Sequence, residues 1–212
     1  MCGRYELLTE FEQLQPILKR NTPQDFEKNY SKQQLITPNN PVIVLKDEGK
    51  ISTSLMLWGF ISEWTKDPFN SSKPKPFNAR SETVRENNLF KRSWQHKRCV
   101  LPASGFFEKG NWIGRKDSHP FWLAGIWSRW MGHEGSEIET CCVLTTEPNK
   151  LIKPIHKRMP VIITNGLEEN WIYPAKNQSQ LREIAKMMDG WCPEEWISKP
   201  MQPPKSSQMS LF

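Results

Sequence analysis

The sequence lacks several features that would place it in common classes of protein. No run of apolar residues approaches the length of a membrane span, and the N-terminal stretch lacks the apolar segment of a secretory signal. There are no internal repeats that would indicate a solenoid. These absences predict a soluble, intracellular protein with no membrane association.

Cysteine is scarce, and its spacing suits neither disulfides nor zinc. The five cysteines stand at positions 2, 99, 141, 142 and 192, an odd number without a Cys-x-x-Cys pair. His96 and Cys99 have a spacing that a metal site could use, but no second pair is nearby in the sequence. A core cysteine beside a surface histidine is the preferred interpretation, so we expect no disulfide framework, no metal and no cofactor.

Length and composition indicate one domain. The chain has 212 residues, of which 37% are hydrophobic, enough to bury a core. We expect a single domain over residues 2–198. The proline- and serine-rich stretch 199–212 is expected to be a flexible tail.

The charge favours a polyanionic partner. The formal net charge is +6, and basic residues gather at 91–98 and at 150–158, although each run could be only a solvated face. There are ten tryptophans, and an exposed indole beside a cation can stack on an unpaired base. Many of these tryptophans must nevertheless belong to the core.

The hydrophobic pattern predicts an α+β fold. Thr9 and Glu12 have capping-box spacing, and Phe11, Leu14 and Leu18 then recur at helical intervals, which predicts a short helix that bends near Pro16. Residues 41–46 and 50–58 predict a β-hairpin, and four further stretches predict strands, at 98–103, 121–127, 138–146 and 159–164. Residues 179–188 predict an amphipathic helix. Strands in the middle and helices at either end favour a curved, mostly antiparallel sheet with flanking helices.

Cys2 stands directly after the first methionine. Aminopeptidases remove an initiator methionine when the next side chain is small, and this would leave an α-amine and a thiol on adjacent carbons. Such a pair closes a five-membered ring with an aldehyde. The alternative is that position 2 simply tolerates a small residue.

Four stretches carry side chains suited to chemistry: CGRY at 2–5, FNARSET at 77–83, PASGFFEKG at 102–110 and TTEPNKLIKPIHKRMP at 145–160. Each has an ordinary explanation. Asn78 could cap a helix, Arg80 and Glu82 could pair on the surface, Glu108 could occupy a turn, and His156 could be solvated. Their combination in this order is what indicates function.

The chain resembles the SOS-response-associated peptidase (SRAP) family, which includes bacterial abasic-site-processing proteins. The matching residues are 1–5, 58–59, Trp64, 78–83, 98–99, 102–108 and 124–127. The last matching stretch runs from Thr145 and Thr146 through His156 to residues 158–160. The resemblance implies a barrel-like fold and a protein of the bacterial cytosol or nucleoid. It also implies a monomer without cofactor that binds single-stranded DNA and joins Cys2 covalently to an abasic site as a thiazolidine, in the DNA damage (SOS) response.

The resemblance also implies roles for individual residues. Cys2 is expected to be the nucleophile, Glu108 the acid/base and His156 the group that assists sugar-ring opening. Asn78 is expected to hold the sugar. The implied DNA-binding residues are Arg4, Trp64, Arg80, Thr146 and Arg158. A weak strand-cleaving lyase activity and reversal of the crosslink follow as corollaries.

Three features at the edges of the resemblance need separate mention. Leu35 stands where family members commonly have asparagine, which leaves any contact from that position open. A strand after the last helix is not evident in the sequence. The final residues QMSLF, with Gln208, Leu211 and Phe212, resemble a bacterial sliding-clamp-binding peptide on a flexible tether.

Two alternatives of different class remain open from the sequence. One is a thiol peptidase in which Cys2 removes its own leader. The other is a non-covalent DNA-binding adaptor that the sliding clamp recruits. A covalent adduct with abasic DNA would separate the expected function from both.

Overall fold

The computed structural model describes residues 3–18, 30–70, 75–189 and 195–201. Cys2 and the predicted clamp-binding residues Gln208, Leu211 and Phe212 lie outside the described residues. No helix among the described residues is long and apolar enough to cross a membrane.

Five strands close into a barrel. They are β3 (Pro41–Asp47), β4 (Ile51–Trp58), β6 (Arg98–Ala103), β9 (Phe121–Met131) and β10 (Glu137–Thr146). The ring β10–β4–β3–β6–β9–β10 is antiparallel at every step except the parallel pairing of β4 with β10. Three short strands extend it: β5 (Asn78–Arg80) and β11 (Met159–Pro160) on β10, and β12 (Ile162–Ile163) on β9.

A second sheet has five strands in the order β13–β8–β7–β1–β2. These are β1 (Tyr5–Leu7), β2 (Gln33–Ile36), β7 (Gly105–Glu108), β8 (Asn111–Arg115) and β13 (Trp196–Pro200). All of its pairings are antiparallel. Strand β1 lies between β2 and β7 and therefore joins the beginning of the chain to strands from its middle and end.

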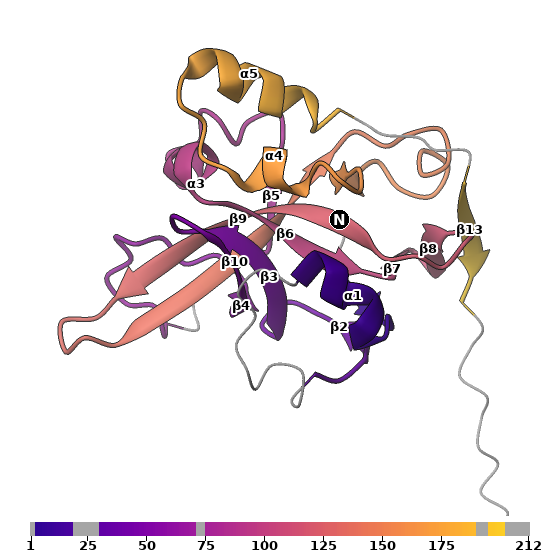
Figure 1. The fold of residues 1–212 in the computed structure, drawn as a ribbon, viewed down its shortest axis with the longest axis horizontal. Coiled ribbons are helices and arrows are strands. Elements are labelled where there is room, and N and C mark those ends of the chain that lie inside the picture. Colours follow the sequence, from indigo (N-terminus) through magenta and orange to yellow (C-terminus); the bar gives the residue numbers. More distant parts are fainter. Residues whose placement is uncertain (1–2, 19–29, 71–74, 190–194, 202–212) are drawn as a thin grey trace, which may run out of the picture.

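The helices lie on two sides of the barrel. They are α1 (Phe11–Leu18), α3 (Lys91–His96), α4 (Glu168–Ile172) and α5 (Gln178–Lys186). In Figure 1, α3, α4 and α5 gather on one side of the strands, and α1 lies on the other. The long strands β9 and β10 extend away from the body as a hairpin (Figure 1).

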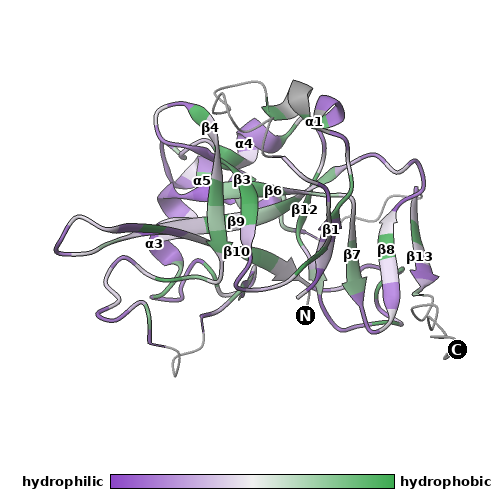
Figure 2. Cartoon of the chain, turned by 90° about the horizontal axis from the view of Figure 1, so that it is seen from below, coloured by the Kyte–Doolittle hydropathy of each residue, from purple (hydrophilic) through white to green (hydrophobic). Residues whose placement is uncertain are grey.

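The hydrophobic core explains why these strands form. In β4 the buried and less buried side chains alternate, as a strand with one face in the core requires. Figure 2 shows largely hydrophobic strands at the centre and hydrophilic helices outside. Six of the tryptophans are buried: Trp58, Trp94, Trp122, Trp127, Trp171 and Trp196.

The predicted fold class is confirmed: a mostly antiparallel, barrel-like sheet with few helices. The predicted hairpin is present as β3 and β4, and the predicted strands appear as β6, β9, β10, β11 and β12. Two expectations are wrong. Helices were expected only toward the two ends of the chain, but α3 lies in the strand-rich middle. No strand was evident after the last helix, but β13 is such a strand, and it runs two residues past the predicted domain boundary at 198. The capping box is not formed, because the Thr9 hydroxyl is hydrogen-bonded to Ser104 Oγ at 2.9 Å.

The burial of His96 and Cys99 agrees with the preferred interpretation, a core cysteine beside a surface histidine. Cys99 is fully buried, whereas His96 is exposed. Burial raises the pKa of the Cys99 thiol and of its neighbours Cys141 and Cys142. These three cysteines are inert core residues, which leaves the described chain without a reactive thiol.

Arg98 does not belong to a solvated basic run. It is 1% exposed, and its guanidinium donates to the carbonyls of Trp94 (2.6 Å), Trp171 (2.7 Å, from Nε) and Tyr173. Those carbonyls stand at the C-terminal ends of α3 and α4, where helices leave acceptors unsatisfied. Burial lowers the pKa of Arg98 to about 10, so the side chain stays charged at neutral pH. Arg98 therefore ties the two helices to the barrel.

We expect Arg98→Met to destabilise the fold by about 3–5 kcal/mol, because buried carbonyls lose their only cationic donor. For a chain of this size this corresponds to a lowering of Tm by about 10 °C. Thermal unfolding checks it. The exposed Arg92→Met, which removes only a surface ion pair with Glu63, should cost less than about 1 kcal/mol. Equal stabilities for the two variants would contradict this role.

Candidate functional site

The register of β1 brings the beginning of the chain to Glu108. Tyr5 pairs with Phe106, and the Phe107 N–H donates to the Arg4 carbonyl at 2.9 Å. Continued two residues beyond Tyr5, the same antiparallel register leads Gly3 toward Glu108. Cys2 itself lies outside the described residues, but it is bonded directly to Gly3.

Glu108 is fixed at the end of β7 by a tight turn. The two residues that follow, Lys109 and Gly110, both have positive φ, at 44° and 76°, and Glu108 then pairs with Asn111 across the hairpin. Two positive φ values in a two-residue loop are typical of a type I′ turn, which continues the twist of the strands. The carboxylate is thus held on a rigid strand end.

A chain of aromatic residues links three of the sequence motifs beneath the site. Tyr5 packs edge-on against Trp58, with ring centroids 5.3 Å apart, and Trp58 packs edge-on against Phe77 at 6.0 Å. The indole of Trp58 also donates to the Phe77 carbonyl at 2.8 Å. Because Phe77 precedes Asn78, this core positions the first strand and the Asn78 strand relative to each other.

His156 lies beside Glu108. Its Nε2 is 3.8 Å from Glu108 Oε1, and both side chains are mostly buried, at 12% and 11% exposed. On the other side of the ring, Nδ1 is 3.1 Å from both the N–H and the carbonyl of Arg158. Neutral His156 can accept the Arg158 N–H at Nδ1 and keep its proton on Nε2, and charged His156 can donate to the Arg158 carbonyl from Nδ1. At 3.8 Å, Nε2 lies just beyond direct hydrogen-bond distance of Glu108, so a proton passes between them through one water or after a small side-chain movement.

Arg158 secures the loop that carries His156. Its guanidinium forms a bidentate pair with Glu82, at 2.6 and 2.8 Å, and also donates to the Thr145 carbonyl. Hydrogen bonding from Arg158 lowers the pKa of Glu82, so the pair persists at neutral pH and is lost as pH falls through that lowered pKa. In this structure Arg158 holds protein groups, and its predicted phosphate contact stays a prediction.

Asn78, Arg80 and Thr146 meet at one end of the barrel. Strand β5 runs parallel to the end of β10, with Asn78 opposite Val143 and Arg80 opposite Thr145. Arg80 is exposed, Asn78 is half-buried, and Thr146 is 7% exposed as the last residue of β10. Because the His156 loop begins just after Thr146, these residues belong to the same end of the molecule as the Glu108–His156 pair.

Trp64 is exposed but lies elsewhere along β10. The turn that carries it is anchored where the Ile61 N–H donates to Thr140 Oγ1 at 2.9 Å and where the Trp130 indole donates to the Thr65 carbonyl at 2.7 Å. Thr140 precedes Thr145 by five residues, which is about 16 Å along a strand. The indole is 54% exposed. The turn that carries Trp64 is therefore anchored at a different point along β10 from Thr145, where Arg80 and Arg158 meet the strand, and its predicted stacking on a base stays a prediction.

Two contributions were not recognised from the sequence. Glu82 was considered only as a surface partner, yet it fixes Arg158 across 76 positions of the chain. The Thr145 carbonyl does the same from β10. Both residues lie within stretches that the sequence analysis selected, 77–83 and 145–160, and this is the only signal that could have suggested them. Within the described ranges, no group of three or more histidine, cysteine, aspartate or glutamate residues could hold a metal ion.

Comparisons with known proteins agree with this geometry. Residues 1–201 match the family model described as SOS response associated peptidase (SRAP). The abasic site processing protein YoaM of Bacillus subtilis is 34% identical over 193 residues, covering 84% of this chain and 82% of the relative. YoqW of Bacillus subtilis, also an abasic site processing protein, is 31% identical over 228 residues and covers 100% of this chain and 99% of the relative.

The fold is shared with a solved structure. The crystal structure of a protein from Bacteroides thetaiotaomicron superposes with a TM-score of 0.82 at 23% identity, covering 95% of this chain and 92% of that one. That likeness extends to the barrel and to the second sheet through most of the chain. With a family match that includes the N-terminal strand, the Asn78 strand, Glu108 and the His156 loop, the chain belongs to the SOS response associated peptidase family.

Proposed function

We propose that this protein processes abasic sites in single-stranded DNA by forming a covalent thiazolidine adduct through Cys2. The observation that carries the proposal is the Glu108–His156 pair at a strand end, toward which the register of β1 leads Gly3. The names of the relatives, abasic site processing proteins, support the same substrate. The proposal requires that Met1 is removed.

The chemistry follows from two groups on one residue. The α-amine of Cys2, with a reference pKa of about 8, is partly neutral and nucleophilic near neutral pH. Its nitrogen adds to the C1′ aldehyde of the ring-opened sugar, and the carbinolamine loses one water to give an imine. The thiolate sulfur then bonds to C1′ while the imine nitrogen takes a proton. The thiazolidine is the sum of protein and DNA less one water.

Glu108 and His156 divide the proton transfers in this proposal. Glu108 takes a proton from the attacking amine and returns one to the departing hydroxyl, which is general acid–base catalysis from a fixed strand end. His156, held by the Arg158 backbone, protonates the sugar oxygen as the ring opens. Because Nε2 faces Glu108, each group can restore the protonation of the other.

The DNA contacts in the proposal spread from this end of the barrel. Asn78 holds the abasic sugar, and Arg80, Arg4 and Thr146 contact the adjacent backbone. Arg158 contributes positive charge behind them. Trp64, whose turn is anchored at a different point along β10, stacks on a base several nucleotides away. Because the imine acidifies the C2′ protons, slow strand cleavage by β-elimination accompanies adduct formation.

The cellular setting is proposed from the sequence. Gln208, Leu211 and Phe212 resemble a sliding-clamp-binding peptide, which would bring the protein to replication forks during the DNA damage response in the bacterial cytoplasm. Removal of residues 208–212 should then abolish binding to a purified clamp and leave adduct formation with free DNA unchanged.

The test of the proposed function uses one substrate. Purified protein is incubated with a single-stranded oligonucleotide that carries one abasic site, and the products are separated on a denaturing gel. We expect a retarded band that requires the abasic site and is absent with the same oligonucleotide carrying an intact base. A protein that binds both strands only non-covalently, or that cleaves peptides and ignores DNA, would contradict the proposal.

A further inference from the structure

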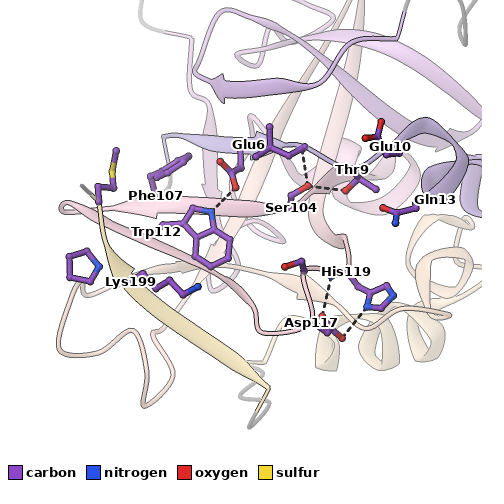
Figure 3. Close-up of a pocket in the computed structure, with 14 residues that line it drawn as sticks. Glu6, Thr9, Glu10, Gln13, Ser104, Phe107, Trp112, Asp117, His119 and Lys199 are labelled. Carbon is purple, nitrogen blue, oxygen red and sulfur yellow. Dashed lines mark hydrogen bonds and ion pairs between the residues drawn. The ribbon is translucent and has the colours of Figure 1, made fainter. Parts of the chain in front are cut away.

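A cavity of about 980 Å³ lies against the second sheet, away from the Glu108 site. Its walls include Glu6 and Phe107 from the sheet, Thr9 and Gln13 from the α1 region, and Lys199 from β13. Figure 3 shows Trp112 in the middle of this group. Successive side chains of a strand point to opposite faces, so Phe107, which lines the cavity, and its neighbour Glu108 face opposite sides of the sheet. We call this hollow the Trp112 cavity.

The indole of Trp112 lies flat on the sheet because two glycines leave room for it. A Cβ added at Gly105 would come within 2.3 Å of the indole Nε1, and one added at Gly114 within 2.6 Å of Cη2. Any larger residue at these positions would push the ring off the backbone. One face of the indole is therefore covered by the sheet, and the ring is a rigid platform at the wall of the cavity.

A buried carboxylate orients this platform and keeps one oxygen for another partner. The indole N–H donates to Glu6 Oε1 at 2.6 Å, and Glu6 is only 9% exposed. The Glu6 side chain makes no other hydrogen bond or ion pair among the described residues. Burial raises the pKa of Glu6 in spite of the bond from Trp112, as expected for a carboxylate that is not fully compensated. The second oxygen is thus an unused acceptor beside an aromatic surface.

The charges around the Trp112 cavity select against phosphate. Its carboxylates are Glu6, Glu10 and Asp117, against the single lysine Lys199 and the neutral or charged His119. Glu10 is paired with Lys32, and Asp117 with Arg115. Lys199 stands across the strands from Trp112 and holds its Nζ over the ring, 5.7 Å from the centroid, so a ligand stacked on the indole displaces this flexible side chain. A neutral planar ligand fits this lining better than the backbone of a nucleic acid does.

We propose that the Trp112 cavity binds a nucleobase, with guanine preferred, stacked on the indole with its N–H edge donating to Glu6. A stacked base uses the aromatic platform whatever its identity, worth about 1–3 kcal/mol. Guanine presents adjacent N1–H and N2–H₂ donors to a carboxylate, whereas thymine presents one N–H between two carbonyl oxygens that a carboxylate repels. Because Glu10 and Asp117 are already paired with cations, Glu6 is the carboxylate that disfavours a phosphate beside the base, and it makes the free nucleoside the preferred source. A volume near 1,000 Å³ lies at the upper end of the range of small-molecule sites.

The experiment titrates the full-length protein with guanosine, thymidine and guanosine 5′-monophosphate by saturation-transfer NMR and calorimetry. We expect saturable binding of guanosine, binding of thymidine weaker by at least about tenfold, and weaker binding of the monophosphate than of guanosine. An intermolecular NOE from the guanine H8 to the Trp112 ring, measured on the unmodified protein, locates the site without a variant. A guanine-containing oligonucleotide forms a further arm, followed only through the NOE to Trp112, because single-stranded DNA is expected to bind at the Glu108 end as well. The same H8 contact, saturating at a lower concentration of oligonucleotide than of guanosine, would overturn the choice of the free nucleoside.

Variants then test the two contacts. Trp112→Leu removes the platform and Glu6→Gln removes the carboxylate, and each should weaken guanosine binding by at least about tenfold. Trp130→Leu is the matched control, because Trp130 is a half-buried indole at the far hairpin whose N–H is bonded to the Thr65 carbonyl. No saturable binding up to about 1 mM, equal binding of thymidine, or the same loss in Trp130→Leu would overturn the proposal. Adduct formation at Cys2 is measured separately, so failure of one account leaves the other standing.

Discussion

Replacing Cys2 with alanine is expected to remove the stable adduct with abasic DNA completely. The variant keeps a small residue at position 2, so Met1 is still removed and the α-amine is still present. It can form an imine with the aldehyde, but it has no sulfur to close the ring, and the imine hydrolyses on a denaturing gel. Reduction with borohydride before electrophoresis should recover a band. The measurement is the fraction of DNA retarded with and without reductant.

The control for a general effect of cysteine loss is Cys99→Ala. Cys99 is fully buried and its thiol has a raised pKa, so it has no role in capture. This variant should form the adduct as the unmodified protein does. A stable adduct from Cys2→Ala, or loss of the adduct from Cys99→Ala at temperatures where that variant is folded, would contradict the thiazolidine.

Replacing Glu108 with glutamine should slow adduct formation by about 10²–10⁴-fold. The amide keeps the size of the side chain and can still accept a hydrogen bond from His156, but it cannot take a proton from the amine or return one to the hydroxyl. The effect should appear in the rate at saturating DNA, with little change in DNA affinity, since Glu108 carries no positive charge toward phosphate. A time course on denaturing gels, with affinity measured on intact-base DNA, separates the two.

Glu147→Gln is the matched control for this prediction. Glu147 is an exposed glutamate that directly follows β10 and is not a member of the Glu108–His156 pair. The rate of that variant should equal that of the unmodified protein. An unchanged rate for Glu108→Gln would remove general acid–base catalysis by this residue from the account.

The sequence was sufficient for the long strands of the barrel and insufficient for the second sheet. The hairpin of β3 and β4 carries its own signal, because alternation and the turn are local. Strands β1 and β13 carry none, because each is short and pairs with a distant part of the chain: Tyr5 pairs with Phe106 and Trp196 with Arg115. Such strands depend on tertiary pairing, which a local pattern does not report.

The candidate site shows the same division. The residue types and their order along the chain were sufficient to select Asn78, Glu108 and His156 as candidate site residues, because the sequence itself gives the chemical nature of each side chain. The sequence could not show that Arg158 is fixed by Glu82, or that the turn carrying Trp64 is anchored at Thr140, since both depend on how distant strands pair. Nor could it separate buried Arg98 from the exposed members of the basic run at 91–98, because the sequence does not report burial.

The intact mass of the DNA adduct tests the central claim most directly. The account predicts a species equal to the polypeptide from Cys2 onward plus the abasic oligonucleotide less one water, with the modified peptide mapping to residue 2. An adduct whose protein portion retains Met1 or an acetylated terminus, or whose DNA is attached to a lysine, would contradict it.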